Sequence, residues 1–412
     1  MDSQDIARTL RHVDAQGLVA LAGGLIRIPS FSPDETPAAR FLADYFRPRG
    51  YDVVMQEVEP GRFQTIAILR GTGGGRSLML NGHLDVNSLK LGARRDPFTP
   101  TVEGDRLYGH GGENMKGGVA TMITAAEAIR TAGIRLRGDV VIACVVGETQ
   151  GGEGTHHLVE SGFRTDMAIL PEPYGIEHLV TIHGGIVHFA VHTYGVTGHL
   201  SQMEKTVNAV LQMAKVVRAL PEVRFTFTPH PQLPALPRLN IGSVIGGRGA
   251  GYVLHEAPYV PDYCTAIVDV HFVPGQTVDG IVADVRRVLD RLVTEDPQLR
   301  YEIEIPPPAF FKGRRRLVME PIDVPHDAYI VQAVARNHAR VLGRPPSTIG
   351  AILPMSYSAG DGSWLWRAGI PCLYYGPRGG FLDPGPDGAY MYITEMVDCA
   401  KVLALTALET CG

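Results

Sequence analysis

The stretch RSLMLNGHLDV, residues Arg76 to Val86, is an apolar run that ends in a histidine and an aspartate. Its length and its leucines are typical of a buried strand. The carboxyl end of such a strand is where an open α/β sheet presents its ligand-binding side chains. His83 and Asp85 are two residues apart, a spacing at which a carboxylate can orient an imidazole ring and fix its tautomer. The stretch therefore predicts a strand of a parallel sheet and one edge of a functional site.

Similar short runs lie on both sides of this stretch. YDVVMQEV and FQTIAILRG precede it, RGDVVIACVVGET follows it, and GGVATMITAAEAIRTAG between the last two has the composition of a helix. Strands that alternate with helices indicate an α/β domain whose largely parallel sheet is covered on both faces. We therefore expect an α/β fold for the first part of the chain.

The pattern changes after residue 182. Alternating runs such as GGIVHFAVHTYGVTG and CTAIVDVHFV are followed or separated by the helical stretches NAVLQMAKVVRAL and VDGIVADVRRVLDRLV. This order of strands and helices suits a compact α+β insert. We predict a first domain made of residues 1–182 and 309–412, and an inserted domain of residues 183–308.

Composition narrows the class of protein. The chain has 412 residues, of which 45% are hydrophobic and 20% charged, and a formal charge of −5. This balance gives no general attraction for nucleic acid or anionic membrane, so neither is expected as a partner. The first thirty residues lack the features of a signal peptide, and no apolar run reaches membrane-spanning length. Five scattered cysteines without a CxxC pair suit reduced thiols in a cytoplasm.

Two further strand-like runs end in a glutamate. VVIACVVGETQ places Glu148 after an apolar strand, where burial would raise the pKa of its carboxyl group and suit it to general-base chemistry. MAILPEP places Glu172 in the same way, and GHGGENMKGG adds Asn114. A lone strand-end glutamate is more often structural, but the ordered succession of these segments predicts a single site.

With these motifs in order, the chain resembles the M20 family of zinc-dependent peptidases and deacylases. The resemblance runs through LNGHLDV, GHGGENMKGG, GETQGGEGT, LPEP, GVTGHLS, VDVHFVPG and AGIPCLYYGPRGG, and so covers nearly the whole chain. It implies a zinc-peptidase-like catalytic domain interrupted by a smaller α+β lid domain, which often forms a homodimer. That organisation agrees with the insert inferred from the strand and helix pattern.

The resemblance also implies roles for individual residues. His83 and Glu172 match ligands of one zinc, Asp85 matches the residue that orients the ligand, and Glu148 matches the general base. His199 of the insert matches the lid histidine that polarises the scissile carbonyl group. The residues expected to bind substrate are His271, Asn208, Gly376 and Arg378.

The chain departs from the family pattern at the second zinc. Asn114 stands where a bridging aspartate is expected, Thr149 replaces the second glutamate of a pair, and PGPDGAYMYI has no histidine where a ligand is expected. An amide oxygen is a neutral ligand, and two dications need a bridging charge between them. We therefore expect no binuclear zinc site, and at most one zinc held by His83, Glu172 and Asn114.

The lid also departs from the pattern, because the arginine that in many members meets a substrate carboxylate is replaced by His271. Histidine lacks the bidentate fork of arginine.

Three functions stay open. The first is an enzyme acting on an amide or related acyl bond of a small amino-acid-derived substrate, with Glu148 as general acid and base and without the two-zinc mechanism. The others are a mononuclear zinc deacylase or dipeptidase, and a non-catalytic ligand-binding or scaffold protein.

Overall fold

The computed structural model describes residues 2–89, 94–254, 258–306, 318–380 and 387–412. The chain forms two compact units. The first unit contains Met1–Ile182, Ile322–Ser356 and Gly360–Gly412, and the second contains His183–Pro321 and Tyr357–Ala359. The boundary expected at residues 308 and 309 lies outside the described residues.

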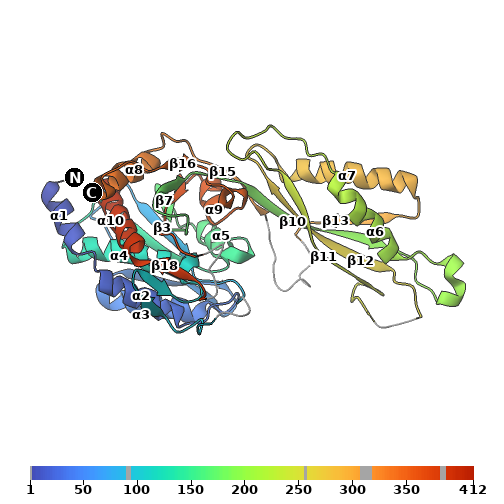
Figure 1. Cartoon of the computed structure of the whole chain (residues 1–412), viewed down its shortest axis with the longest axis horizontal. Helices are drawn as coiled ribbons and strands as arrows, with labels where there is room; N and C mark the ends of the chain where they lie inside the picture. Colours follow the sequence, from blue (N-terminus) through green and yellow to red (C-terminus); the bar gives the residue numbers. More distant parts are fainter. Residues whose placement is uncertain (1, 90–93, 255–257, 307–317, 381–386) are drawn as a thin grey trace. The chain divides into compact units, whose positions relative to one another are not determined.

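The first unit is built on an eight-stranded sheet (Figure 1). In spatial order its strands are β1 (Asp52–Glu59), β2 (Arg62–Leu69), β6 (Val140–Val145), β3 (Leu78–His83), β7 (Met167–Leu170), β17 (Cys372–Tyr374), β8 (His178–Val180) and β16 (Thr348–Gly350). The central strands β6, β3, β7 and β17 run parallel, so their carboxyl ends meet at one edge. The expected α/β fold is confirmed.

Helices cover both faces of this sheet. One face carries α2 (Ala15–Ile26), α3 (Thr36–Phe46), α4 (Gly117–Thr131), α8 (Tyr329–Leu342) and α10 (Ile393–Cys411), with α1 (Ser3–Arg11) against α4 and α10. The other face carries α5 (Glu153–Glu160) and α9 (Gly362–Arg367). The side chains of β3 and β6 are buried on both faces, which explains the apolar sequence of all of β6 and of the first half of β3.

The second unit is a five-stranded antiparallel sheet with two helices on one face (Figure 1). Its strands are β11 (Arg238–Gly247), β12 (Tyr263–Phe272), β10 (Gly185–Tyr194), β13 (Arg300–Glu304) and β14 (Val318–Met319), and its helices are α6 (Ala209–Ala219) and α7 (Val278–Glu295). Alternate residues of β10 and β12, such as Phe189 and Val268, pack against the two helices. The opposite face of the sheet carries several polar side chains, such as His188, His192 and Asp269.

The remaining elements are short. They are the strands β4 (Thr101–Glu103), β5 (Arg106–Tyr108), β9 (Ile182–His183), β15 (Ile322–Asp323) and β18 (Tyr390–Tyr392), and the single turns η1 (Arg47–Arg49), η2 (Gly112–Lys116), η3 (Glu148–Gln150), η4 (Leu200–Lys205), η5 (Leu220–Glu222) and η6 (Met355–Tyr357). All five cysteines are unpaired and buried. No helix among the described residues is long and apolar enough to span a membrane.

Candidate active site

Glu148 lies in the tight turn η3 between the end of β6 and the start of α5. The turn is flanked by Gly147, Gly151 and Gly152, with φ angles of 69°, 100° and 72°. Residues with a side chain rarely adopt this left-handed backbone conformation. These three glycines therefore allow the chain to reverse its direction within a few residues. The turn thereby holds the Glu148 carboxyl group at the carboxyl end of the central strands.

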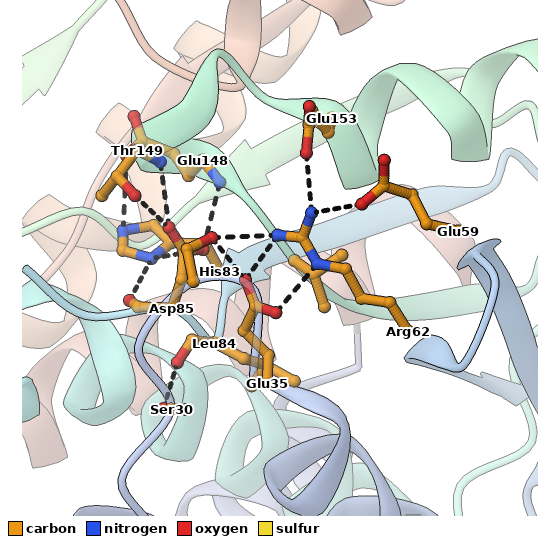
Figure 2. A network of polar contacts seen from close by, with 12 residues as sticks. Ser30, Glu35, Glu59, Arg62, His83, Leu84, Asp85, Glu148, Thr149 and Glu153 are labelled. Atoms are coloured by element: carbon orange, nitrogen blue, oxygen red, sulfur yellow. Dashed lines mark hydrogen bonds and ion pairs between the residues drawn. The ribbon is translucent and has the colours of Figure 1, made fainter. Parts of the chain in front are cut away.

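The Asp85 carboxylate fixes this turn from the end of β3 (Figure 2). The main-chain N–H of Glu148 donates to its Oδ1 atom at 3.0 Å, and the N–H and hydroxyl of Thr149 donate to its Oδ2 atom at 2.9 and 2.7 Å. Burial acts to raise the pKa of Asp85, but His83 and the bonds from Thr149 outweigh it and hold the pKa below its usual range. Asp85 is therefore an anion that anchors the backbone of Glu148.

The ring of His83 is oriented by the main chain of Asp85. Its Nδ1 atom lies 3.0 Å from the Asp85 carbonyl oxygen and 3.5 Å from the Asp85 carboxylate. The sequence suggested the carboxylate for this role, but the three bonds from Glu148 and Thr149 draw that group toward the turn. The other ring nitrogen, Nε2, lies 3.0 Å from the Oδ1 atom of Asn114.

Two more carboxyl groups face the Nε2 atom of His83. Glu172 is 3.7 Å away and Glu148 is 4.0 Å away. Burial acts to lower the pKa of His83, but Asp85, Glu172 and Glu148 together raise it well above its ordinary value. Burial raises the pKa of both glutamates, and their mutual repulsion raises that of Glu148 further, although His83 opposes this. The site therefore binds protons at neutral pH more readily than isolated carboxyl groups do.

Glu172 follows β7, and its backbone is held in place by the close packing of neighbouring segments. A Cβ atom on Gly376 would lie 2.3 Å from the carbonyl carbon of Pro171, and one on Gly118 would lie 2.1 Å from the Pro171 oxygen. Both glycines therefore allow neighbouring segments to press against the Pro171–Glu172 backbone. Gly376 was expected to contact substrate, and its observed neighbours are Pro171 and Glu172.

The donor groups can be compared with the needs of zinc. Thr149 uses its hydroxyl group to hold Asp85, so it supplies no anionic ligand where the family pattern has a glutamate. No group of three His, Cys, Asp or Glu side chains suited to a metal was found within the described ranges. Position 149 thus lacks the anionic ligand that a second zinc would need, and the absence of a binuclear site stays a prediction. The Nε2 atom of His83 lies 3.0 Å from the Asn114 oxygen and 3.7 Å from the Glu172 carboxylate, on either side of the roughly 3.3 Å that separates two ligands of tetrahedral zinc.

Asp361 is a further acidic member of the cluster. It precedes α9 and is 1% exposed. Neither carboxyl oxygen has a hydrogen bond of normal geometry from the described residues. Burial, followed by the charges of Asp85 and Glu172, raises its pKa to about 7, while His83 and Thr155 act to lower it. Its sequence, AGDGS, resembles an ordinary turn and gave little signal.

Three of the predicted residues, His199, Asn208 and His271, belong to the second unit. The Nδ1 atom of His199 accepts a hydrogen bond from the N–H of Ser201 at 3.2 Å, so the ring hydrogen of its neutral form is on Nε2. Asn208 caps α6 by accepting bonds from the N–H groups of Val210 and Leu211. The side-chain oxygen of Asn208 therefore already has a structural role.

The environment of His271 differs from that of a substrate-binding arginine. Its Nδ1 atom donates to the carbonyl oxygen of Tyr357 at 2.7 Å, and its Nε2 atom lies 3.3 Å from the Asp269 carboxylate. Burial acts to lower the pKa of His271, but Asp269 and the Tyr357 carbonyl raise it overall. Both ring nitrogens are thus engaged by acceptors. In the first unit, Arg378 is exposed and pairs with Glu395 at 3.3 Å.

The fold and the family of the chain follow from comparison with known proteins. The structure of a tripeptidase from Staphylococcus aureus superposes with a TM-score of 0.71 at 19% identity, covering 96% of this chain and 99% of the other. This likeness shows that the two chains share a fold. The chain belongs to the peptidase family M20/M25/M40, whose family model matches residues 79–409. This confirms the family that the motifs indicated.

Two curated relatives extend the comparison. A protein of Halalkalibacterium halodurans named N-formyl-4-amino-5-aminomethyl-2-methylpyrimidine deformylase is 29% identical, over 98% of this chain and 97% of its own. An acetylornithine deacetylase of Vibrio vulnificus is 30% identical, over 65% of this chain and 69% of its own. The chain is therefore an enzyme, an amidohydrolase of the M20 peptidase type.

Proposed function

We propose that this enzyme hydrolyses the acyl-amide bond of a small N-acyl amine, with Glu148 as general base and then general acid. The observation that carries the proposal is the position of the Glu148 carboxyl group. It is held at the carboxyl end of the parallel strands, is 16% exposed and lies 4.0 Å from His83. The deformylase and deacetylase relatives both remove an acyl group from nitrogen, by their names.

The chemistry follows from the state of Glu148. Its carboxylate takes a proton from the water that attacks the acyl carbon, and then gives that proton to the departing amine. A raised pKa favours both steps, because it makes the carboxylate a stronger base and keeps the transferred proton available near neutral pH. Asp85 keeps the turn in place while the proton moves.

His199 is the proposed stabiliser of the carbonyl oxygen. Because Ser201 donates to its Nδ1 atom, the Nε2 atom carries the hydrogen that can bond to a developing oxyanion. The edge-on ring of Tyr259, 5.7 Å away between ring centroids, limits the orientation of His199 within the second unit. A His199→Gln variant keeps a donor near this position and is the matched control for His199→Ala.

The state of His271 favours a substrate without a free α-carboxylate. Its two nitrogens are engaged by Tyr357 and Asp269, so it offers no vacant donor to an anion. An N-formyl or N-acyl amine of the kind named for the deformylase relatives meets this condition better than an N-acyl amino acid does. We therefore expect the N-formyl aminomethylpyrimidine to be hydrolysed faster than N-acetylornithine.

A mononuclear zinc deacylase is the second candidate, and the spacing of His83, Asn114 and Glu172 favours it. These three residues would hold the ion, which would lower the pKa of a bound water molecule and so supply hydroxide. Glu148, at 4.0 Å from His83, would then handle the same proton. Neither candidate function uses a two-zinc mechanism, because Asn114 and Thr149 do not provide the anionic ligands that it needs.

The test uses the purified enzyme, the two N-acyl amines named above and elemental analysis. Glu148→Gln is expected to lower kcat by roughly 10²-fold to 10⁴-fold without unfolding the protein. Wild-type activity that persists with a chelator, in protein without zinc, supports the acid and base mechanism. One zinc per chain, and activity that is lost with it, selects the second candidate. Full turnover by Glu148→Gln would overturn both.

We also propose that the enzyme acts as a homodimer through the second unit. β11 is an edge strand of the described sheet, since it pairs with β12 alone. Val244 of this strand and Leu211 of α6 are 49% and 58% exposed, which leaves apolar surface beside unpaired backbone groups. The five unpaired cysteines support a cytoplasmic location.

A further inference from the structure

Arg62 is a buried cation next to the candidate active site. It begins β2, is 4% exposed, and binds Glu35 through two bonds of 2.9 and 2.6 Å. Its Nη1 atom also donates to Glu153 at 2.7 Å and to Glu59 at 3.2 Å (Figure 2). Burial acts to lower the pKa of Arg62, but Glu35 and then Glu153 raise it, so the side chain remains charged. The guanidinium group is thus the centre of an ion network.

This network contacts the catalytic turn directly. Glu153 is the first residue of α5, and its N–H donates to the carbonyl oxygen of Gly147, the residue before Glu148, at 3.2 Å. A Cβ atom on Gly147 would lie 2.7 Å from the Nη2 atom of Arg62. The guanidinium therefore packs against the backbone at the start of the turn and binds the side chain at its end.

A second side chain of β2 reinforces this arrangement. Gln64, two residues after Arg62 along the strand, accepts a bond from the N–H of Val146 at 3.3 Å and donates to the carbonyl oxygen of Gly154 at 3.0 Å. Val146 and Gly154 lie just outside the turn on either side. Together with Asp85, which binds the turn at Glu148 and Thr149, β2 holds both ends of the loop.

We propose that Arg62 is a positioning residue for Glu148: through Glu153 and the backbone of Gly147 it fixes the turn that carries the general base. The inference rests on the proposed role of Glu148. In this proposal the ion pair between Arg62 and Glu153 positions the turn that carries Glu148. The ion pair between Arg62 and Glu59 only stabilises the fold. Glu59 ends β1 and belongs to the same hairpin as Arg62.

The two glutamates provide a matched pair of variants. Glu153→Gln and Glu59→Gln each remove one ion pair from the same Nη1 atom. We expect Glu153→Gln to lower kcat about tenfold with little change in KM, because a displaced base impairs the chemical step rather than binding. It should also accelerate amide hydrogen exchange at residues 147–152. Glu59→Gln should change neither quantity, although both variants lower the urea midpoint.

Arg62→Lys is the second variant, since a lysine keeps the charge but has no fork to reach Glu35 and Glu153 together. It should reproduce the effects of Glu153→Gln. Equal kcat values and equal exchange rates for Glu153→Gln and Glu59→Gln would overturn the inference, and leave Arg62 a structural residue. If Glu148→Gln also kept full turnover in this assay, the proposed function itself would have failed. The exchange measurement needs no substrate and separates the two cases.

Discussion

The Nε2 atom of His83 lies 3.0 Å from the amide oxygen of Asn114. The Nδ1 atom of the same ring lies 3.0 Å from the carbonyl oxygen of Asp85. Both oxygen atoms are acceptors, so this arrangement suits a His83 ring that carries hydrogen on both nitrogens. The carboxyl groups around it raise its pKa in the same direction. A proton on the Nε2 atom and a zinc ion would compete for the same face of His83.

Asn114→Asp should shift that competition toward the metal. A carboxylate in place of the amide supplies a charged ligand, and we expect zinc at pH 7 to bind at least about tenfold more tightly than to the wild type. Isothermal titration with zinc measures this, with Asn114→Ser as the control that removes the amide without adding charge. Zinc binding of equal strength in Asn114→Asp and Asn114→Ser would contradict the role assigned to position 114.

Asp85→Asn should destabilise the enzyme and misplace Glu148. The carboxylate accepts three hydrogen bonds from the turn and lies beside a cationic ring, so removing its charge leaves donors and an imidazolium poorly compensated. We expect the free energy of unfolding to fall by about 3 kcal/mol. Urea denaturation measures the change, and Thr149→Val, which removes one of the three bonds, should lose only about 1 kcal/mol. Similar losses for both variants would argue against Asp85 as the anchor.

The convergence of His83, Glu148 and Glu172 was predictable because each follows a strand-like run, and parallel strands end at one edge of a sheet. The order of the motifs along the chain indicated the family. The change in strand pattern after residue 182 indicated the inserted domain. Arg62 was not recognised, because an arginine at the start of a strand usually faces solvent. The alternation of Arg62 and Gln64 on one face of an apolar strand was the available signal.

The surroundings of His271 and Asp361 could not be inferred from local sequence. The partners of His271 are a carbonyl group 86 residues away in the chain and an aspartate on its own strand. The pKa of Asp361 depends on burial among groups contributed by β3 and the segment after β7. Both properties arise from tertiary packing, which spacing along the chain does not encode.

Val244→Lys should weaken the proposed homodimer. The lysine would place a charge on an exposed position of the edge strand β11, where it opposes strand pairing between subunits. Light scattering after size-exclusion chromatography should give a dimer mass for the wild type and a monomer mass for the variant at low micromolar concentration. Glu295→Lys on α7 is the surface control and should remain dimeric. A monomeric wild type would contradict the proposal.

His183 should make the stability of the enzyme depend on pH. Burial lowers its pKa from 6.5 to about 4, although a 2.9 Å contact with the carbonyl oxygen of Ser358 partly opposes this. Between those values the unfolded chain binds a proton that the folded chain excludes. The stabilisation is therefore complete above pH 6.5 and is lost as the pH falls toward 4. From pH 7 to pH 5 the loss attributable to His183 should be about 2 kcal/mol.

Urea denaturation at pH 7 and pH 5 measures this contribution when the wild type is compared with His183→Gln. The amide side chain of glutamine can still donate to Ser358 but does not titrate, so the variant should lose about 2 kcal/mol less between the two pH values. Other histidines, such as the half-buried His110 and the buried His338, also have lowered pKa values and contribute equally to both proteins. The opposite result would be a free energy of unfolding that falls by the same amount between pH 7 and pH 5 in the wild type and in His183→Gln. That result would contradict a lowered pKa for His183 in the folded enzyme.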